Sequence, residues 1–368
     1  MNSTQLSEDR LKNLTAFLKS QAASYLALTP TEIFYLTNRA IEGIQLYITK
    51  DYPAKPIIAF SSPMTAWQTE ELFSNVPGTR IIIYEVKSNF GKEFADIIKQ
   101  NPTRKIYISN ALACSVKTLL SSRLKDISSS VIIEETSIIA DIRESKTLEE
   151  IKIIKENQQF TRYAVEKLAR QYIKNAISRR KKITEQSVKI KILEYFASID
   201  AGPAFEPIVA FGRNTCHPHY ITGDTRLNPD GDIVMIDAGC RRKNYNSDLT
   251  RTFLLGKIKP GVREVYQIVK DAQKSAISVV RAGAECATVD AAARRLIETK
   301  GFGGCFIHGV GHGLGFEIHE SPAINKFSFK KLKENSVVTV EPGIYLKGEF
   351  GVRIEDTVVV DKTGCSIL

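Results

Sequence analysis

The feature that most constrains this chain is a set of apolar, strand-like segments in its last third, each carrying an acidic residue at or near its end. The segment Gly231–Gly239 contains Asp237, and Asp248 opens a second segment after a short polar turn. Two further segments repeat this plan around Glu341 and Glu355. Short apolar runs bounded by glycine and polar residues are typical of strands. Two strand pairs that each deliver two acids can therefore face each other across a cleft.

Four carboxylates in one cleft repel each other, and their pKa values rise unless cations neutralise them. Two divalent metal ions would supply the matching charge, and His312 adds one nitrogen ligand to the four acids. Oxygen ligands with a single imidazole suit Mn²⁺, Co²⁺, Fe²⁺ or Zn²⁺ and argue against a thiolate-held structural zinc. Metals about 3.5–4 Å apart can bridge a water, lower its pKa and direct it at a polarised carbonyl. The set therefore predicts a hydrolytic two-metal site.

The histidines support this interpretation. All of them lie in two short segments beside these strands, at His217, His219, His308, His312 and His319. A single acid at a strand end is more often a solvated turn residue than a ligand. Five histidines gathered beside one set of acids weaken that explanation. The run Gly309–Gly315 is also too rich in glycine for a helix interior and predicts a tight segment where backbone approaches a ligand.

Several short blocks follow one another along the chain: Ile236–Gly239, Ser247–Thr252, Gly311–Gly315, His319–Pro322, Glu341–Gly343 and Arg353–Asp356. In content and order they resemble the pita-bread metallopeptidases, a family that includes methionine aminopeptidase, prolidase and aminopeptidase P. The resemblance covers approximately residues 150–368. It implies an α+β pita-bread catalytic domain with a curved antiparallel sheet. Creatinase shares this fold but lacks the metal ligands, whereas this chain keeps all five.

The resemblance implies a role for each ligand. Asp237 and Asp248 would hold one metal ion, and His312 and Glu341 would complete the second. Asp248, Glu355 and a bridging water would be shared by both ions. Glu341 would also take the proton from that water as general base. The expected cofactor is a pair of Mn²⁺ ions, with Co²⁺, Zn²⁺ or Fe²⁺ as alternatives.

The resemblance also implies catalytic roles for residues that hold no metal. His219 matches the family's upstream active-site histidine, whereas His217 matches no residue with an assigned role. His319 would steady the scissile carbonyl or the tetrahedral intermediate. His308 would line the leaving-group side, as in the proline-specific members.

The resemblance also implies that an arginine braces the ligands. Arg353 lies two residues before Glu355, which places both side chains on one strand face. The alternative is an ordinary arginine on the surface of a strand. The resemblance implies the same bracing role for Tyr345.

The first part of the chain predicts a separate α/β domain, because strand-like and helical stretches alternate there. Strands are expected at residues 25–28, 57–60, 81–86, 105–109 and 131–134, and helices at 6–18 and 66–72. The fragment Thr29–Thr37 resembles the family's creatinase-like N-terminal domain. Methionine aminopeptidases usually lack such a domain, so its presence points to the prolidase and aminopeptidase P branch.

We expect the creatinase-like N-terminal domain to span residues 1–143 and the catalytic domain to span residues 144–368. The polar segment Ala140–Thr147 should join them and lead into a helix capped near Ser145 or Thr147. Further helices are expected near residues 148–176, 184–198, 261–282 and 287–299. They should cover one face of the sheet, with the metals on the other.

Charge and cysteine content limit the choice of partners and compartment. The net charge is +10, and basic residues are most closely spaced in the run 174–191. We interpret this run as a solvated helix face and expect no specific nucleic-acid partner, because no nucleic-acid module accompanies it. The cysteines show no paired spacing, and neither a signal peptide nor a membrane-spanning apolar run is present. We therefore expect a cytoplasmic protein with reduced thiols and no membrane association; the resemblance leaves a homodimer open.

The sequence thus predicts a di-metal aminopeptidase that removes the first residue from peptides whose second residue is proline. One alternative is a prolidase restricted to Xaa-Pro dipeptides, and another is a non-enzymatic binding protein on the same fold. A third is a hydrolase that uses Cys305 beside His308. Thiol alkylation would inactivate such a hydrolase and chelators would not, which is the reverse of the behaviour expected of a metal enzyme.

Overall fold

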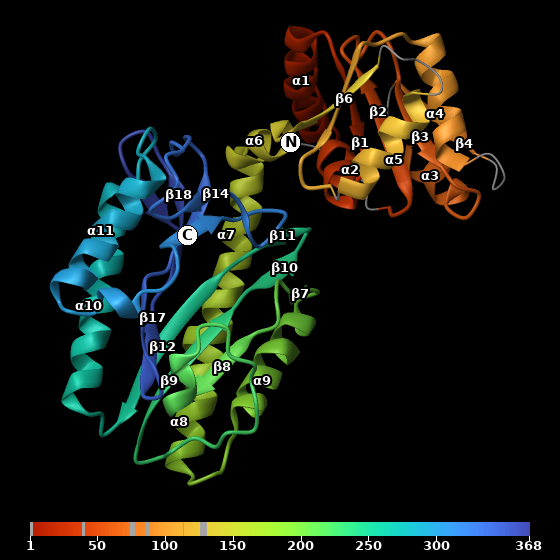
Figure 1. The fold of residues 1–368 in the computed structure, drawn as a ribbon. Coiled ribbons are helices and arrows are strands. Elements are labelled where there is room, and N and C mark those ends of the chain that lie inside the picture. The colour runs from red at the N-terminus through yellow and green to blue at the C-terminus, as the bar shows by residue number, and fades with distance from the viewer. Residues whose placement is uncertain (1–2, 39–40, 74–77, 85–88, 113, 126–130) are drawn as a thin grey trace. The chain divides into compact units, whose positions relative to one another are not determined.

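The computed structural model of this 368-residue chain describes residues 3–38, 41–73, 78–84, 89–112, 114–125 and 131–368. The chain forms two compact units, Met1–Ile142 and Arg143–Leu368 (Figure 1). Within the described ranges, no helix is long and apolar enough to cross a membrane.

A mixed sheet forms the centre of the N-terminal unit. Its strands are β1 (Ser24–Ala27), β2 (Ile44–Thr49), β3 (Ile57–Ser61), β4 (Thr79–Ile83), β5 (Lys105–Ser109) and β6 (Ile132–Thr136), in the order β4-β3-β2-β1-β5-β6. The helices of this unit are α1 (Ser3–Gln21), α2 (Pro30–Thr37), α3 (Ala66–Phe73), α4 (Asn89–Gln100) and α5 (Cys114–Lys125), and α6 (Ile138–Glu144) leads into the second unit. The predicted α/β class of this part is confirmed.

Strand β2 is the element of this sheet that the sequence analysis did not identify. All of its residues except Gln45 are buried, and it pairs with β1 and β3. A strand buried on both faces lacks the alternation of apolar and polar residues that marks a half-buried strand. Helix α4 covers part of the sheet, where Phe94 packs edge-on against Tyr47 and Phe60. Residues 85 and 86 of the predicted strand 81–86 lie outside the described residues.

The second unit has an α+β architecture, as predicted. Its helices are α7 (Leu148–Arg162), the π-helix η1 (Tyr163–Ala169), α8 (Arg170–Ser178), α9 (Glu185–Ser198), α10 (Pro260–Val279) and α11 (Cys286–Thr299), with short 3₁₀ turns η2 (Gly212–Cys216) and η3 (Gly303–Cys305). Its strands are β7 (Gly202–Pro203), β8 (Ile208–Phe211), β9 (Gly231–Ala238), β10 (Cys240–Arg242), β11 (Tyr245–Asn246), β12 (Leu249–Gly256), β13 (Gly311–Gly313), β14 (Glu320–Ile324), β15 (Val337–Val340), β16 (Gly343–Leu346), β17 (Phe350–Arg353), β18 (Asp356–Val360) and β19 (Cys365–Ile367).

The strand pairs of this unit are antiparallel wherever the structure describes them. They form several short sheets, in the orders β12-β9-β8, β14-β13-β15-β18-β19, β16-β17 and β11-β10-β7. The short turn expected between Asp237 and Asp248 is wrong, because the hairpin of β10 and β11 is inserted there. Strands β9 and β12 nevertheless pair directly along their whole length.

The long helix that opens this unit begins as predicted and is interrupted where a single helix was expected. Thr147 is its N-cap and forms a capping box with Glu150, which satisfies backbone donors at the helix start. The predicted helix 148–176 is not one α-helix, because the π-helix η1 separates α7 from α8.

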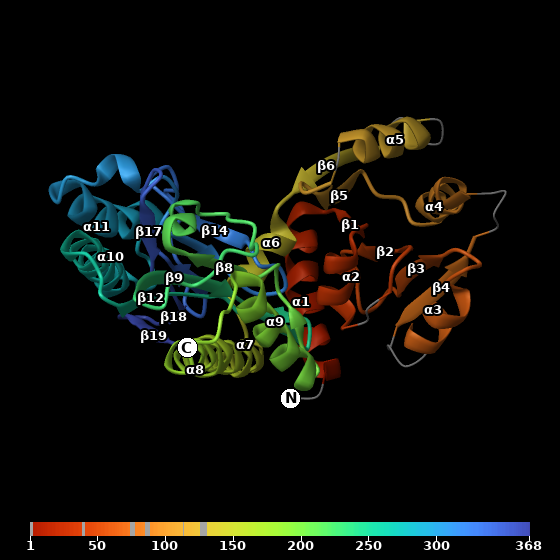
Figure 2. The same cartoon turned by 90° about the horizontal axis from the view of Figure 1, so that it is seen from below.

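Side-chain alternation along β9 separates a helix-covered face from a polar one. Val234, Ile236 and Ala238 belong to a core that also contains Phe196 of α9. Successive side chains of a strand point to opposite faces, so Asp237 points away from this core. Figure 2 shows α7, α8 and α9 gathered on one side of these strands.

The same alternation applies to the strands that carry the other pair of acids. Val338, Val340 and Ile354 pack in a core with α10 and α11, two helices that lie side by side in both views (Figures 1 and 2). Glu341 and Glu355 each follow one of these core residues directly, so they point to the opposite face. The prediction that helices cover one face and the acids occupy the other is confirmed for both strand groups.

One glycine is fixed by the close approach of two strands. A Cβ added to Gly311 on β13 would overlap the backbone carbonyl of Thr339 on β15. No shift of a flexible side chain can relieve this overlap, because the obstacle is backbone. Only glycine therefore fits at this point.

We expect Gly311→Ala to lower the free energy of unfolding by about 3 kcal/mol, since overpacking against backbone is not easily relieved. Gly304→Ala is the matched control, because a Cβ there meets nothing within 4 Å. Urea unfolding of the chelator-treated protein, monitored by circular dichroism, measures both variants. Equal unfolding midpoints for the two variants would contradict the assigned packing.

Candidate metal centre

A cleft of about 380 Å³ lies on the polar face of both strand groups. Its walls bring together all the predicted ligands and catalytic residues: Asp237, Asp248, His312, Glu341, Glu355, His219, His308, His319 and Arg353. His217 is not among the described residues of its lining and instead stacks beside Tyr220.

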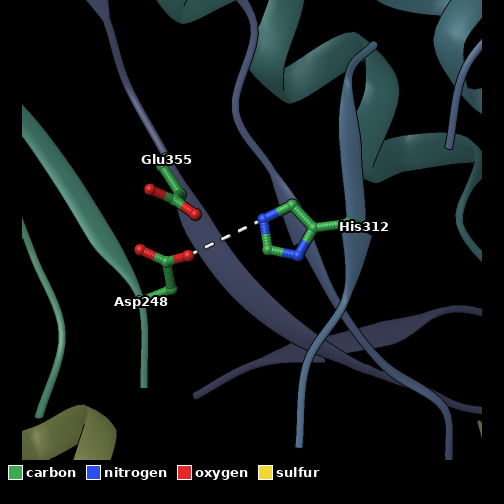
Figure 3. Close-up of side chains that lie close together, drawn as sticks. All are labelled: Asp248, His312 and Glu355. Carbon is green, nitrogen blue, oxygen red and sulfur yellow. Dashed lines mark ion pairs between the residues drawn. The ribbon is translucent and has the colours of Figure 1, made fainter. Parts of the chain in front are cut away.

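The five predicted ligand side chains lie on strands or directly beside them. Asp237 lies on β9, Asp248 directly precedes β12, and His312 lies on β13. Glu341 directly follows β15, and Glu355 lies between β17 and β18. Ligand atoms of Asp248, His312 and Glu355 all lie within 4.8 Å of one another, and Figure 3 shows the three side chains pointing together. The imidazole Nε2 of His312 lies 3.7 Å from Asp248 Oδ2 and 3.3 Å from Glu341 Oε1.

Burial and mutual repulsion dominate the electrostatics of the cleft. Burial, followed by the charges of neighbouring carboxylates, raises the pKa values of Asp248 and Glu355 well above their usual range. Burial also raises the pKa of Asp237, although Arg353 opposes the shift. Burial alone would raise the pKa of Glu341, but its neighbours, above all His312, lower it to about 2. The cleft therefore concentrates more negative charge than its own basic residues neutralise.

Two buried oxygen atoms indicate where cations fit. Asp237 Oδ2 accepts a hydrogen bond from Arg353 at 2.6 Å, and Glu355 Oε2 accepts one from Thr250 at 2.8 Å. Asp237 Oδ1 and Glu355 Oε1 are buried without a hydrogen-bond partner among the described residues. An unsatisfied buried acceptor costs about 1–3 kcal/mol. A divalent cation bound by these oxygens would remove that cost and the repulsion together, so the donor set fits the predicted metal pair.

Helix α7 supplies a clamp that the sequence analysis missed. The buried amide of Gln158 donates to the backbone carbonyl of Asp248 at 2.7 Å and accepts from its N–H at 3.1 Å. Thr357 donates to the same carbonyl at 3.0 Å. The neighbouring Asn157 donates to two carbonyls of the β10–β11 hairpin. A pair of carboxamides one turn after the buried Ile154, on the buried side of the helix, is the signal that could have revealed the clamp.

Two threonines orient the carboxylates. Thr250 lies two residues after Asp248 and donates to Glu355. Thr339 lies two residues before Glu341, donates to it at 3.4 Å, and accepts from the backbone N–H of His312 at 3.1 Å. Each threonine shares a strand face with its neighbouring ligand, because residues two apart point the same way. The spacing of two residues is a signal in the sequence that could have identified both threonines.

Arg353 and Tyr345 form hydrogen bonds within the cleft, and Tyr345 also contacts His308. The guanidinium of Arg353 donates to Asp237 and, at 2.9 Å, to the hydroxyl of Tyr345. The nitrogen Nδ1 of His308 lies 2.7 Å from the carbonyl of Gly309, which can only accept, so Nδ1 carries the proton. Nε2 then accepts from the Tyr345 hydroxyl at 3.0 Å. Burial lowers the pKa of His308, consistent with this neutral form. Both ring nitrogens are therefore engaged, and His308 offers the cleft its ring rather than a hydrogen bond.

His319 and His219 differ from His308 in having ring nitrogens that are not engaged by the described residues of the protein. The His319 ring packs edge-on against His312 with 4.3 Å between ring centres. Burial, and then the charge of His312, lowers the pKa of His319. A neutral imidazole with a free N–H can donate to a substrate oxygen beside the metal ligands.

Buried ion pairs fix the loop that carries His319. Glu320 accepts from Lys146 at 2.7 Å and also pairs with Arg143, and all three side chains are buried. Ser321 donates to Glu144 at 2.6 Å. These partners lie far apart in the sequence, so no spacing rule could have joined them.

The cysteine-based alternative finds no support in the cleft. Cys305 is not among the residues described in its lining. The ring nitrogens of His308 are bonded to Tyr345 and Gly309, which leaves no nitrogen to activate a thiol.

Known proteins resemble this chain in sequence and in fold. Residues 152–362 match the family model Peptidase_M24, described as Metallopeptidase family M24. A Xaa-Pro dipeptidase of Pyrococcus furiosus is 39% identical over 231 residues, which cover 63% of this chain and 64% of that protein. The structure of a Xaa-Pro dipeptidase from Bacillus anthracis matches with a TM-score of 0.84 and 27% identity, over 98% of this chain and 97% of that one. An X-Pro aminopeptidase from Thermotoga maritima MSB8 matches with a TM-score of 0.77 and 27% identity, over 94% and 95%.

We expect Gln158→Leu to lower the melting temperature and to weaken metal binding about 10–100-fold. The reason is that the backbone of Asp248 loses its two hydrogen bonds with Gln158. The matched control is Gln159→Leu, since Gln159 is exposed on the same helix. Thermal melts with increasing Mn²⁺ report stability and apparent affinity together. The clamp would be refuted by two variants that show the same Mn²⁺ dependence.

Proposed function

The chain belongs to metallopeptidase family M24, and on that premise we propose that it hydrolyses the bond between a first residue and a following proline. The observation that carries the proposal is the convergence of the five predicted ligand side chains in one cleft, where Asp237 and Glu355 each have a buried oxygen without a partner among the described residues. We place Xaa-Pro dipeptides first among its substrates, because similar proteins include Xaa-Pro dipeptidases. This order reverses the sequence-based expectation, in which the aminopeptidase came first.

The ligand residues provide for hydrolysis by an activated water. When bound by Asp237, Asp248, His312, Glu341 and Glu355, two divalent cations supply Lewis-acid polarisation of the scissile carbonyl and lower the pKa of water. Glu341 is held ionised by its basic neighbours, so it can take the proton from the attacking water.

Histidines and apolar residues complete the proposed mechanism. His319 and His219 can each donate a hydrogen bond to the carbonyl oxygen as negative charge develops on it. A tertiary Xaa-Pro amide has no N–H, so recognition of proline relies on contact with its ring. Phe205, Ile208 and Ile318 offer apolar surface in the cleft for that contact.

An aminopeptidase acting on longer peptides is the second candidate. Among the described residues that line the cleft, Arg353 is the one lysine or arginine. It is buried and already bound to Asp237, Tyr345 and the carbonyl of Pro218. A dipeptide carboxylate therefore meets no free cation there. A longer peptide would present a neutral carbonyl at the same point.

Removing metal should abolish hydrolysis and lower the melting temperature, because the carboxylates would again repel each other; Mn²⁺ or Co²⁺ should restore both. At a metal concentration of about 100 times its dissociation constant, the stabilisation is about 2.7 kcal/mol. Asp248→Ala should lose the response to Mn²⁺, whereas His217→Ala should keep it. Full activity after removal of metal, verified by elemental analysis, would sink the two-metal proposal.

Substrate length can be tested by measuring kcat/KM for an Xaa-Pro dipeptide, the matching Xaa-Pro-Yaa tripeptide and a Met-Ala-Yaa control. We expect the dipeptide to give the highest value, because similar proteins include Xaa-Pro dipeptidases. A preference for the tripeptide would move the assignment to the aminopeptidase. A preference for the methionyl peptide would reject both.

A further inference from the structure

We propose that the side-chain amide of Asn325 binds the C-terminal carboxylate of the dipeptide substrate and so fixes the direction in which the substrate lies. This inference rests on the proposed dipeptidase function. It names a neutral group that binds the substrate carboxylate in a cleft where the described residues offer no free cation. Asn325 lines the cleft directly after β14, and the metal site does not use its side chain.

The position of Asn325 follows from strand pairing. His312 on β13 pairs with Ala323 on β14, and Asn325 lies two residues further along. Asn325 directly follows β14 and lines the cleft together with His312. It lies roughly 7 Å along the strand direction from the position that pairs with His312. One extended substrate residue, about 3.6 Å long, and a hydrogen bond of about 2.9 Å together span nearly the same distance.

The neighbouring glycine allows this placement. A Cβ on Gly309 would come within 2.9 Å of the Asn325 Cβ and would also overlap the carbonyl of Ile324. Gly309 therefore lets Asn325 approach the segment of His308, whose ring faces the same cleft.

Hydrogen bonding defines which end of the amide is free. The backbone N–H of Phe327 donates to Asn325 Oδ1 at 2.9 Å, which fixes the orientation of the amide. The group left over is the Nδ2 amino group, and it can only donate. A donor cannot bind the ammonium of a free amino terminus, but it can bind a carboxylate. The substrate carboxylate therefore lies at Asn325, and its ammonium lies toward the opposite end of the cleft.

The variant Asn325→Asp tests this assignment. A carboxylate can still accept from Phe327, so the local turn is kept, but the donor is replaced by a negative charge. We expect kcat/KM for Ala-Pro to fall about 10–100-fold, mainly through KM, because a hydrogen bond to a charged group contributes about 1.5–3 kcal/mol. Alanyl-prolinamide, which carries no carboxylate, should lose at most about 3-fold. The ratio of the two kcat/KM values is the readout, because a folding or metal defect lowers both alike.

A matched control exists in the same chain. Asn228 is exposed, and its Oδ1 accepts from the N–H of Asp230, two residues on, as Asn325 does from Phe327. Asn228→Asp makes the same charge change outside the cleft and should leave the ratio unchanged. An unchanged ratio in Asn325→Asp, with Ala-Pro cleaved by the wild type, would overturn the assignment of Asn325 alone. A wild type that cleaves no Xaa-Pro dipeptide would overturn the dipeptidase proposal and this inference with it.

Discussion

Repulsion among buried carboxylates is the constraint on which the catalytic unit depends. Asp248 and Glu355 have raised pKa values because each is buried beside other acids. The protein fixes one oxygen of Asp237 through Arg353 and one of Glu355 through Thr250, and it leaves the other oxygen of each without a partner. Such an arrangement is costly in isolation and becomes favourable when cations share the ligands. The arrangement of these carboxylates therefore fits the proposed metal site.

The same strands that hold the ligands also build the hydrophobic cores. On β9, Ile236 enters the core beneath α9 while Asp237 enters the cleft, and Val340 and Glu341 repeat this division against α10 and α11. A one-residue slip of either strand would bury the acid in the core and expose the apolar residue. Because side chains alternate along a strand, the register that packs the helices correctly also places the acids in the cleft.

Much of the site was predictable because its chemistry requires particular residue types. Five ligands and the bracing Arg353 could be proposed from the acids, the glycine-rich run around His312 and the family resemblance. Strand β2 was missed because it is buried on both faces. The clamp from Gln158 was missed because its partner lies 90 residues away. The adjacent carboxamides on the buried side of the helix mark the clamp but do not identify that partner. Substrate length is not fixed by these residue types, because it depends on which cleft groups are already engaged, as Arg353 is.

The sequence separation of the contacts around the ligands has a consequence for folding. Gln158 and Asp248 are 90 residues apart, Thr250 and Glu355 are 105 apart, and Arg353 and Asp237 are 116 apart. Closing loops of such length is entropically costly before the contacts form, and chains dominated by distant contacts fold slowly. Local helices and hairpins of the catalytic unit can form early, but no part of the ligand set is complete within any one of them. We therefore expect metal binding to become possible only when folding of this unit is nearly finished.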